Sequence, residues 1–104
     1  MAEYVDLAAS GDVVEGEAKA FAVGDVEVAV ARAGGMLHAF SDICTHRGCN
    51  LSMGGEVEGT SIMCECHGSV FSILTGAVEN PPATEPIAIY RVRETEAGRI
   101  EVEA

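Results

Sequence analysis

Two short segments decide the fold of this chain, CTHRGC at residues 44–49 and CECHGS at residues 64–69. They hold all four cysteines of the sequence and two of its three histidines. Together they contain the spacing Cys-x-His, seventeen residues, Cys-x-x-His, formed by Cys44, His46, Cys64 and His67. Two thiolates and two imidazoles are the ligands of a 2Fe–2S cluster with mixed cysteine and histidine ligation. The pattern therefore predicts an electron carrier with this cofactor.

Length and charge narrow the class of protein. The 104 residues suffice for one domain, spanning residues 1–104, and are too few for two. Six basic and seventeen acidic residues give a formal net charge of −11, which disfavours nucleic acid and anionic membranes as partners. The sequence shows neither a signal peptide nor a run of about 18 apolar residues, so we expect a cytoplasmic protein. The acidity suits docking to a basic partner, although solubility alone would also explain it.

Short apolar runs separated by turn signals predict an all-β fold. These expected strands are residues 18–23, 26–32, 36–40, 56–58, 61–64, 70–74, 87–92 and 99–102. No run of ten residues has the pattern of an amphipathic helix, so an antiparallel β-sandwich or partly open barrel is expected. Two loops, at about residues 42–54 and 64–72, would bind the cluster. Residues 79–83 form a third loop, because consecutive prolines cannot donate to a sheet.

The mixed ligand set has electrostatic consequences. Two ferric ions, two sulfides and two thiolates sum to zero when the other ligands are neutral imidazoles. Adding an electron to a neutral cluster costs less than adding it to the dianion that four thiolates produce, so imidazole ligation raises the midpoint potential. The second nitrogen of each imidazole keeps a proton that the ferric ion acidifies, so reduction should couple to proton uptake at alkaline pH.

The motifs CTHRGC and CECHGS resemble those of Rieske iron–sulfur proteins, and the chain is similar to the Rieske-type ferredoxins. The resemblance is dense from Asp42 to Phe71 and continues to about Arg93. It implies a Rieske-type fold with one 2Fe–2S cluster per chain. It also implies that Cys44 and Cys64 hold the buried iron, and that His46 and His67 hold the outer iron, where the electron leaves.

The same resemblance implies a function and partners. Rieske-type ferredoxins carry electrons for multicomponent ring-hydroxylating dioxygenases, and they are not enzymes themselves. The expected partners are a flavin-containing ferredoxin reductase, which oxidises NAD(P)H, and the terminal Rieske oxygenase. A Rieske subunit of another oxidoreductase is the alternative within the family.

Several residues outside the ligand set also carry expectations from the resemblance. High-potential respiratory Rieske proteins join cysteines at the positions of Cys49 and Cys66 in a disulfide, which most dioxygenase ferredoxins lack. Here a disulfide is expected, with two buried free thiols as the alternative. Ser69 matches a serine that bonds a bridging sulfide, whereas Phe71 replaces a tyrosine donor, so the potential should lie below the respiratory range. The resemblance also places Pro81 and Pro82 over the cluster.

Three other readings of the cysteines and histidines remain open. A structural zinc site uses the same ligand types, but Cys44-x-His46 is tighter than the usual spacing. A cluster on all four cysteines would need a Cys-x2-Cys step that the sequence lacks. A redox sensor switching Cys49 and Cys66 would need exposed thiols of low pKa. His38 is expected to be a half-buried strand residue without a functional role.

Overall fold

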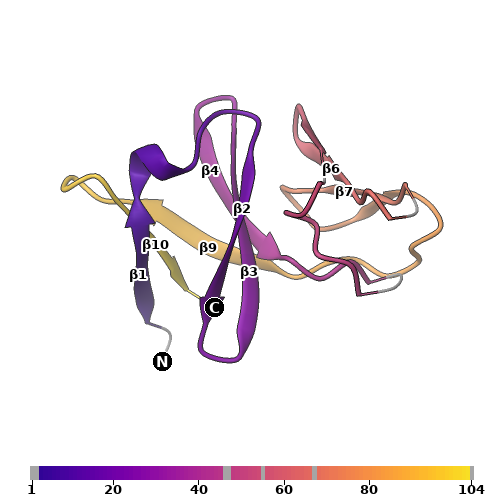
Figure 1. Cartoon of the computed structure of the whole chain (residues 1–104), viewed down its shortest axis with the longest axis horizontal. Coiled ribbons are helices and arrows are strands. Elements are labelled where there is room, and N and C mark those ends of the chain that lie inside the picture. Colours follow the sequence, from indigo (N-terminus) through magenta and orange to yellow (C-terminus); the bar gives the residue numbers. More distant parts are fainter. Residues whose placement is uncertain (1–2, 46–47, 55, 67, 104) are drawn as a thin grey trace.

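The protein folds into two antiparallel β-sheets in the computed structural model (Figure 1), which describes residues 3–45, 48–54, 56–66 and 68–103. The strands are β1 (Tyr4–Ala9), β2 (Ala18–Val23), β3 (Val26–Ala33), β4 (Met36–Ser41), β5 (Glu56–Glu58), β6 (Ser61–Met63), β7 (Val70–Ser72), β8 (Val78–Asn80), β9 (Ile89–Glu94) and β10 (Arg99–Glu103). A 3-10 helix, η1 (Ser10–Asp12), follows β1. The expected all-β class is confirmed.

The larger sheet has six strands in the order β1-β10-β9-β4-β3-β2. It is the scaffold, and in Figure 1 it occupies the left and centre of the molecule. Strand β3, which lies between β4 and the edge strand β2, is buried on both faces, and the alternation of its side chains explains why. Val28 and Val30 face a core with Ile100 and Val102, whereas the smaller Ala29 and Ala31 face the second sheet.

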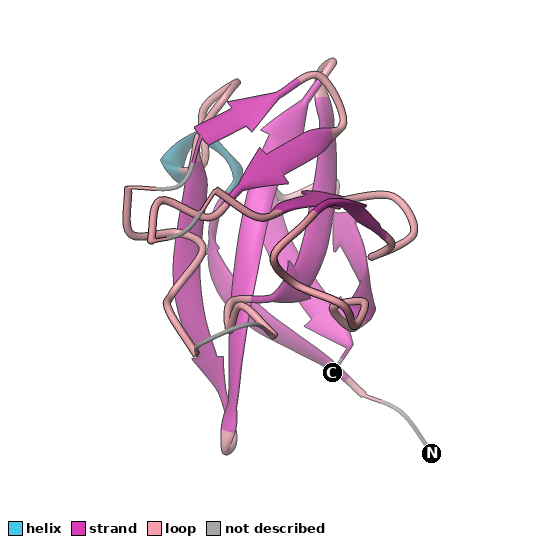
Figure 2. Ribbon diagram, turned by 90° about the vertical axis from the view of Figure 1, so that its right-hand side faces the viewer, coloured by secondary structure: helices cyan, strands magenta, loops and turns pink. Residues whose placement is uncertain are grey.

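The smaller sheet has four strands in the order β5-β6-β7-β8, and Figure 2 views the molecule from its side. Its core joins Phe40 of β4 with Leu51, Ile62, Phe71 and Ile73. Alanines on the facing side of β3 leave space for the two phenylalanine rings, so the small sheet packs closely on the scaffold. The loops with the cysteine motifs project from this sheet and its connections.

The structure confirms the expected strands in outline and corrects several details. It adds β1, η1 and β8, which the sequence interpretation did not include, and it places β9 two residues later than expected. The assignment of Glu79 and Asn80 to a loop is wrong, because both residues belong to β8, in which Asn80 pairs with Val70. The residues that lack an N–H donor for the sheet begin only at Pro81, and the peptide bond between Pro81 and Pro82 is cis. Among the described residues no helix is long and apolar enough to cross a membrane.

Candidate metal centre

The two cysteine motifs adopt the same backbone geometry. In residues 44–49, the Cys44 N–H donates to Cys49 O (2.8 Å) and the Gly48 N–H donates to Cys44 O (2.9 Å). Residues 64–69 repeat both bonds at the same offsets, from Cys64 N to Ser69 O (2.7 Å) and from Gly68 N to Cys64 O (2.9 Å). We call these segments loop 1 and loop 2.

A glycine closes each loop at the same position. Gly48 and Gly68 have φ angles of +74° and +79°, in the left-handed region that L-residues with a side chain adopt only at a cost. The chain therefore makes a tight turn at each of these two glycines. The repeated element Cys-x-x-x-Gly thus has the same closing hydrogen bonds and the same glycine turn in both loops.

Both loops turn their first cysteine toward the interior. Cys44 is 2 % exposed and Cys64 is 1 % exposed, and both belong to the core of the small sheet. Two residues beyond each loop, Leu51 and Phe71 are fully buried beneath it. Two thiol side chains from separate loops are therefore buried in one core, in a water-poor environment, the setting expected for the inner iron. His46 and His67 lie outside the described residues.

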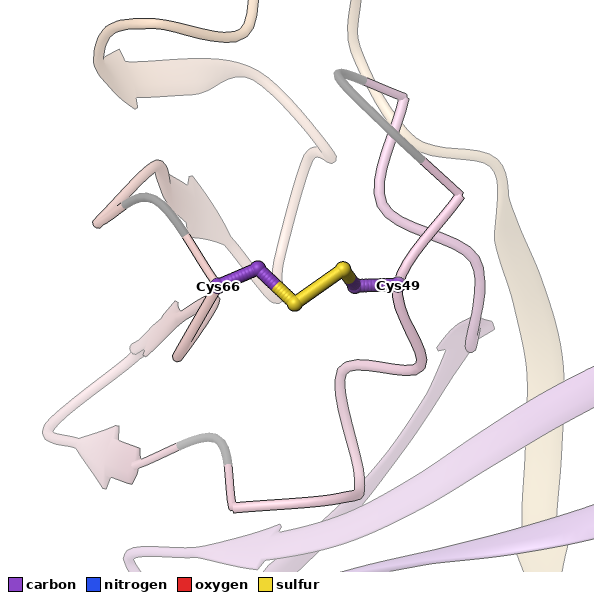
Figure 3. The surroundings of a disulfide bond; sticks show 2 residues. All are labelled: Cys49 and Cys66. Atoms are coloured by element: carbon purple, nitrogen blue, oxygen red, sulfur yellow. A yellow bond between two sulfur atoms is a disulfide. The ribbon is translucent and has the colours of Figure 1, made fainter.

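A disulfide joins the two loops. Cys49 of loop 1 and Cys66 of loop 2 are bonded across the gap between them (Figure 3), with their Cα atoms 6.6 Å apart. The expected pairing is confirmed. The sulfur atoms of Cys49, Cys64 and Cys66 all lie within 4.8 Å of one another. Since the disulfide occupies two of these sulfurs, a cluster held by thiolates from all four cysteines is excluded.

Loop 1 is attached to the scaffold by a buried carboxylate. Asp42 is fully buried, and its Oδ1 accepts the Ser52 N–H at 2.7 Å. Its Oδ2 accepts the Ser52 hydroxyl at 3.0 Å and the Asn50 amide at 2.8 Å. Asp42 therefore does not bond its own backbone as a turn residue would. Ser41 makes that local turn, because its Oγ accepts the Ile43 N–H.

Loop 2 is attached to the proline loop instead. Ser69 is fully buried, and its Oγ accepts the Ala83 N–H at 3.0 Å. That bond leaves the hydroxyl proton available for another acceptor, as a bond to a bridging sulfide requires. Asn80 also donates to Gly68 O at 3.4 Å. Phe71 is buried and has no hydroxyl group to add a second donor.

The proline segment also holds loop 1, a contact that sequence reasoning did not find. The Thr45 hydroxyl donates to Glu85 O at 2.7 Å, so residues 80–85 contact both loops. Pro81 and Pro82 are exposed. Gly54, five residues beyond loop 1, lies against Glu65 of loop 2, because a Cβ built on Gly54 would lie 1.5 Å from Glu65 Oε2. The spacing of cysteines and histidines carries no signal for any of these contacts.

The donor chemistry fits a 2Fe–2S cluster. Two buried thiol groups come from two loops of equal geometry, and the disulfide and the proline segment fix the distance between those loops. Thiolates are the ligands that iron–sulfur clusters require, and the surrounding apolar core limits access of water.

Comparison with known proteins also indicates a 2Fe–2S protein. Residues 3–91 match a family described as Rieske [2Fe-2S] domain. The chain is 36 % identical over 102 residues to the anthranilate 1,2-dioxygenase ferredoxin subunit of Burkholderia cepacia, covering 98 % of this chain and 93 % of that protein.

Solved structures agree with the sequence comparison. The ferredoxin of carbazole 1,9a-dioxygenase from Nocardioides aromaticivorans IC177 superposes with a TM-score of 0.89 at 31 % identity, covering 95 % of each chain. A chain in a complex of reduced oxygenase and oxidized ferredoxin in carbazole 1,9a-dioxygenase gives a TM-score of 0.86 at 32 % identity, with 94 % of this chain and 99 % of that chain covered.

Proposed function

Because the chain belongs to the Rieske [2Fe-2S] domain family, we propose that it carries single electrons from an NAD(P)H-dependent flavin reductase to the terminal oxygenase of an aromatic-ring dioxygenase system. One observation supports this most strongly: two loops closed by the same backbone hydrogen bonds bury Cys44 and Cys64 in one core. The chain is a carrier and not a catalyst, since the relatives it matches are ferredoxin subunits.

We assign the cluster ligands to Cys44 and Cys64 at the inner iron and to His46 and His67 at the outer iron. When bound, a 2Fe–2S cluster supplies one reversible one-electron step. The assignment of the cysteines rests on their burial and on the repeated backbone bonds. That of the histidines rests on their positions in the two motifs.

The remaining residues of the site keep its geometry fixed during electron transfer. The Cys49–Cys66 disulfide restrains the separation of the loops, and Leu51 and Phe71 exclude water from below. The Ser69 hydroxyl can donate toward a sulfide while its oxygen stays bonded to Ala83. Because Phe71 offers no second donor, the midpoint potential should lie below that of respiratory Rieske proteins.

The partners and the setting complete the proposal. A terminal oxygenase is the expected electron acceptor, because a similar ferredoxin has been solved together with the oxygenase of its own system. The donor would be a flavin-containing reductase. Residues 1–104 would form one Rieske domain, working in the cytoplasm.

The first test is the midpoint potential of the purified holoprotein by protein-film voltammetry from neutral to alkaline pH. A one-electron wave whose potential falls as pH rises is expected, because the ligand imidazoles lose protons more easily in the oxidised state. A wave at low potential that does not change with pH would contradict the histidine assignment. No wave at all would favour a structural zinc site.

A pair of variants sharpens this test. His67→Cys should lower the potential and remove one of the titrating groups, since a thiolate replaces a neutral imidazole. His38→Gln is the matched control, because His38 lies on β4 and is half-buried away from both loops. An effect of equal size in both variants would contradict the ligand assignment.

A further inference from the structure

The outer face of the small sheet contains a pocket next to loop 2. Strand pairing places Met63 between Glu56 and Val70 across the sheet, and places Glu58 opposite Ser61. These five residues line a pocket of about 290 Å³, while the alternate residues, such as Ile62 and Phe71, point into the core. We call it the β5–β7 pocket.

The β5–β7 pocket combines apolar and acidic chemistry. Met63 is 38 % exposed and Val70 is half-buried, so together they form an apolar floor. The exposed Glu56 and Glu58 stand at its β5 side. The Ser61 hydroxyl donates to Glu79 of β8, which brings a third carboxylate to the same face.

The chain that forms this half of the molecule is rich in carboxylates and poor in positive charge. The sequence has no lysine or arginine from Gly48 to Tyr90, and it has five glutamates there. The salt bridges between described residues all belong to the six-stranded sheet or to its edges: Arg32–Glu94, Arg91–Glu103, Arg93–Glu101 and Arg99–Asp6. The scaffold therefore neutralises much of its own charge, whereas the carboxylates around the pocket remain available to a cation from outside.

We propose that the β5–β7 pocket receives an arginine side chain from an electron-transfer partner protein. A long basic side chain fits because its methylene groups can pack on Met63 and Val70 while the guanidinium pairs with Glu56 and Glu58. A small metal cation would use only the carboxylates of this surface, and an apolar side chain would use only its floor.

The pocket lies where a bound arginine could position an electron-transfer partner. Met63 directly precedes Cys64, and Val70 directly follows Ser69, so the floor of the pocket is continuous with both ends of loop 2. An arginine anchored here would hold the surface of the partner beside the candidate metal centre. This purpose rests on the proposed function as an electron carrier, but the binding of a basic side chain does not.

The test uses a small probe, so that it is independent of any redox partner. Oxidised holoprotein labelled at the methionine methyl groups is titrated with the peptide acetyl-Leu-Arg-Leu-amide and followed by NMR. The Met63 methyl resonance should shift with saturation, whereas that of Met36, exposed on β4 of the scaffold, should not move. The same peptide with citrulline in place of arginine keeps the shape without the charge, and it should bind more weakly.

Two double variants that remove the same number of negative charges test whether the peptide binds at the β5–β7 pocket. Glu56→Gln with Glu58→Gln should weaken binding of the arginine peptide about fivefold at low salt, as expected for two exposed ion pairs. Asp25→Asn with Glu96→Gln is the control, because both residues are exposed in turns of the six-stranded sheet, and it should leave binding unchanged.

Three results would overturn the proposal: no saturable shift at Met63, equal binding of the citrulline peptide, or equal weakening by both double variants. Equal weakening by both double variants would mean that peptide binding depends only on the net charge of the protein. Failure of the pocket is distinguishable from failure of the proposed function. A holoprotein that gives the expected voltammetric wave but no Met63 shift is a carrier without this docking contact.

Discussion

Loop 1 and loop 2 share one backbone geometry but are attached to the molecule by different chemistry. Both are closed by the same two hydrogen bonds and by a glycine at the fifth position. Loop 1 is held by the buried carboxylate of Asp42, whereas loop 2 is held by the neutral hydroxyl of Ser69. The comparison shows that the Cys-x-x-x-Gly element sets the shape of a loop, while residues outside that element decide how firmly it is attached.

Residues at equivalent positions of the two loops also have different roles. The sixth position is Cys49 in loop 1, which forms the disulfide, and Ser69 in loop 2, which binds the proline segment. The third is His46 in loop 1 and Cys66 in loop 2. Once cysteine and glycine have fixed the backbone, the intervening positions can supply a ligand, a covalent link or an anchor.

The largest expected effect comes from the apolar residues beneath the loops. Phe71→Ala should lower the free energy of unfolding by about 3–5 kcal/mol and Leu51→Ala by about 2–5 kcal/mol, because each leaves a cavity in a fully buried core. Urea unfolding of the holoprotein measures both, and visible absorbance reports whether the cluster is retained. Leu74→Ala is the control, since Leu74 is 52 % exposed. A loss as small as that of the control would contradict the packing described here.

The disulfide should rank next, because it is the covalent link between the two loops. Replacing both cysteines, Cys49→Ser with Cys66→Ser, should cost about 3 kcal/mol, since the bond closes a loop with a sequence separation of 17. The cluster should still assemble, because Cys44 and Cys64 are unchanged. Chemical denaturation with and without a thiol reductant is the measurement. If the reductant destabilised the double variant as much as the parent protein, its effect could not be assigned to this bond.

The two anchors provide the most direct test of the comparison. Asp42→Asn should destabilise by about 2–3 kcal/mol, because a charged acceptor is lost and an amide donor then faces the Ser52 N–H. Ser69→Ala should cost about 1 kcal/mol, the usual contribution of one neutral hydrogen bond. Thermal unfolding of both variants measures the difference, with the exposed Asp25→Asn as a control. Equal losses of stability in Asp42→Asn and Ser69→Ala would mean that the two anchors contribute equally.

The sequence predicted the parts of the site that depend on local chemistry. The cysteine pattern, the two glycine turns and the disulfide pairing could all be anticipated, because each follows from residue types at fixed spacing or from the resemblance they carry. The anchors could not, because the Thr45–Glu85 bond forms only after distant segments have packed together, and the choice of Ser52 as a partner of Asp42 depends on how the buried carboxylate is oriented in the fold. Strand β8 was missed for a similar reason, since three residues beside two prolines give too short a pattern to recognise.

The smallest expected effect concerns a carboxylate anchor that lies outside both loops. Glu15 accepts the backbone N–H groups of Gly35 and Gly34 at the β3–β4 turn, and these bonds hold the pKa of its carboxyl group below the ordinary value. Its contribution to stability is therefore fully present above the ordinary glutamate pKa, and it is lost as the pH falls through the lowered pKa.

Glu15→Gln should remove that part of the pH dependence while leaving the midpoint potential unchanged, because the turn belongs to the scaffold and not to the loops. Thermal unfolding of parent and variant, from neutral to acidic pH, is the measurement. The exposed Glu96→Gln is the control, at the turn before β10. If Glu15→Gln changed the midpoint potential, the β3–β4 turn would influence the metal centre, and the separation of the scaffold from the two loops would not hold.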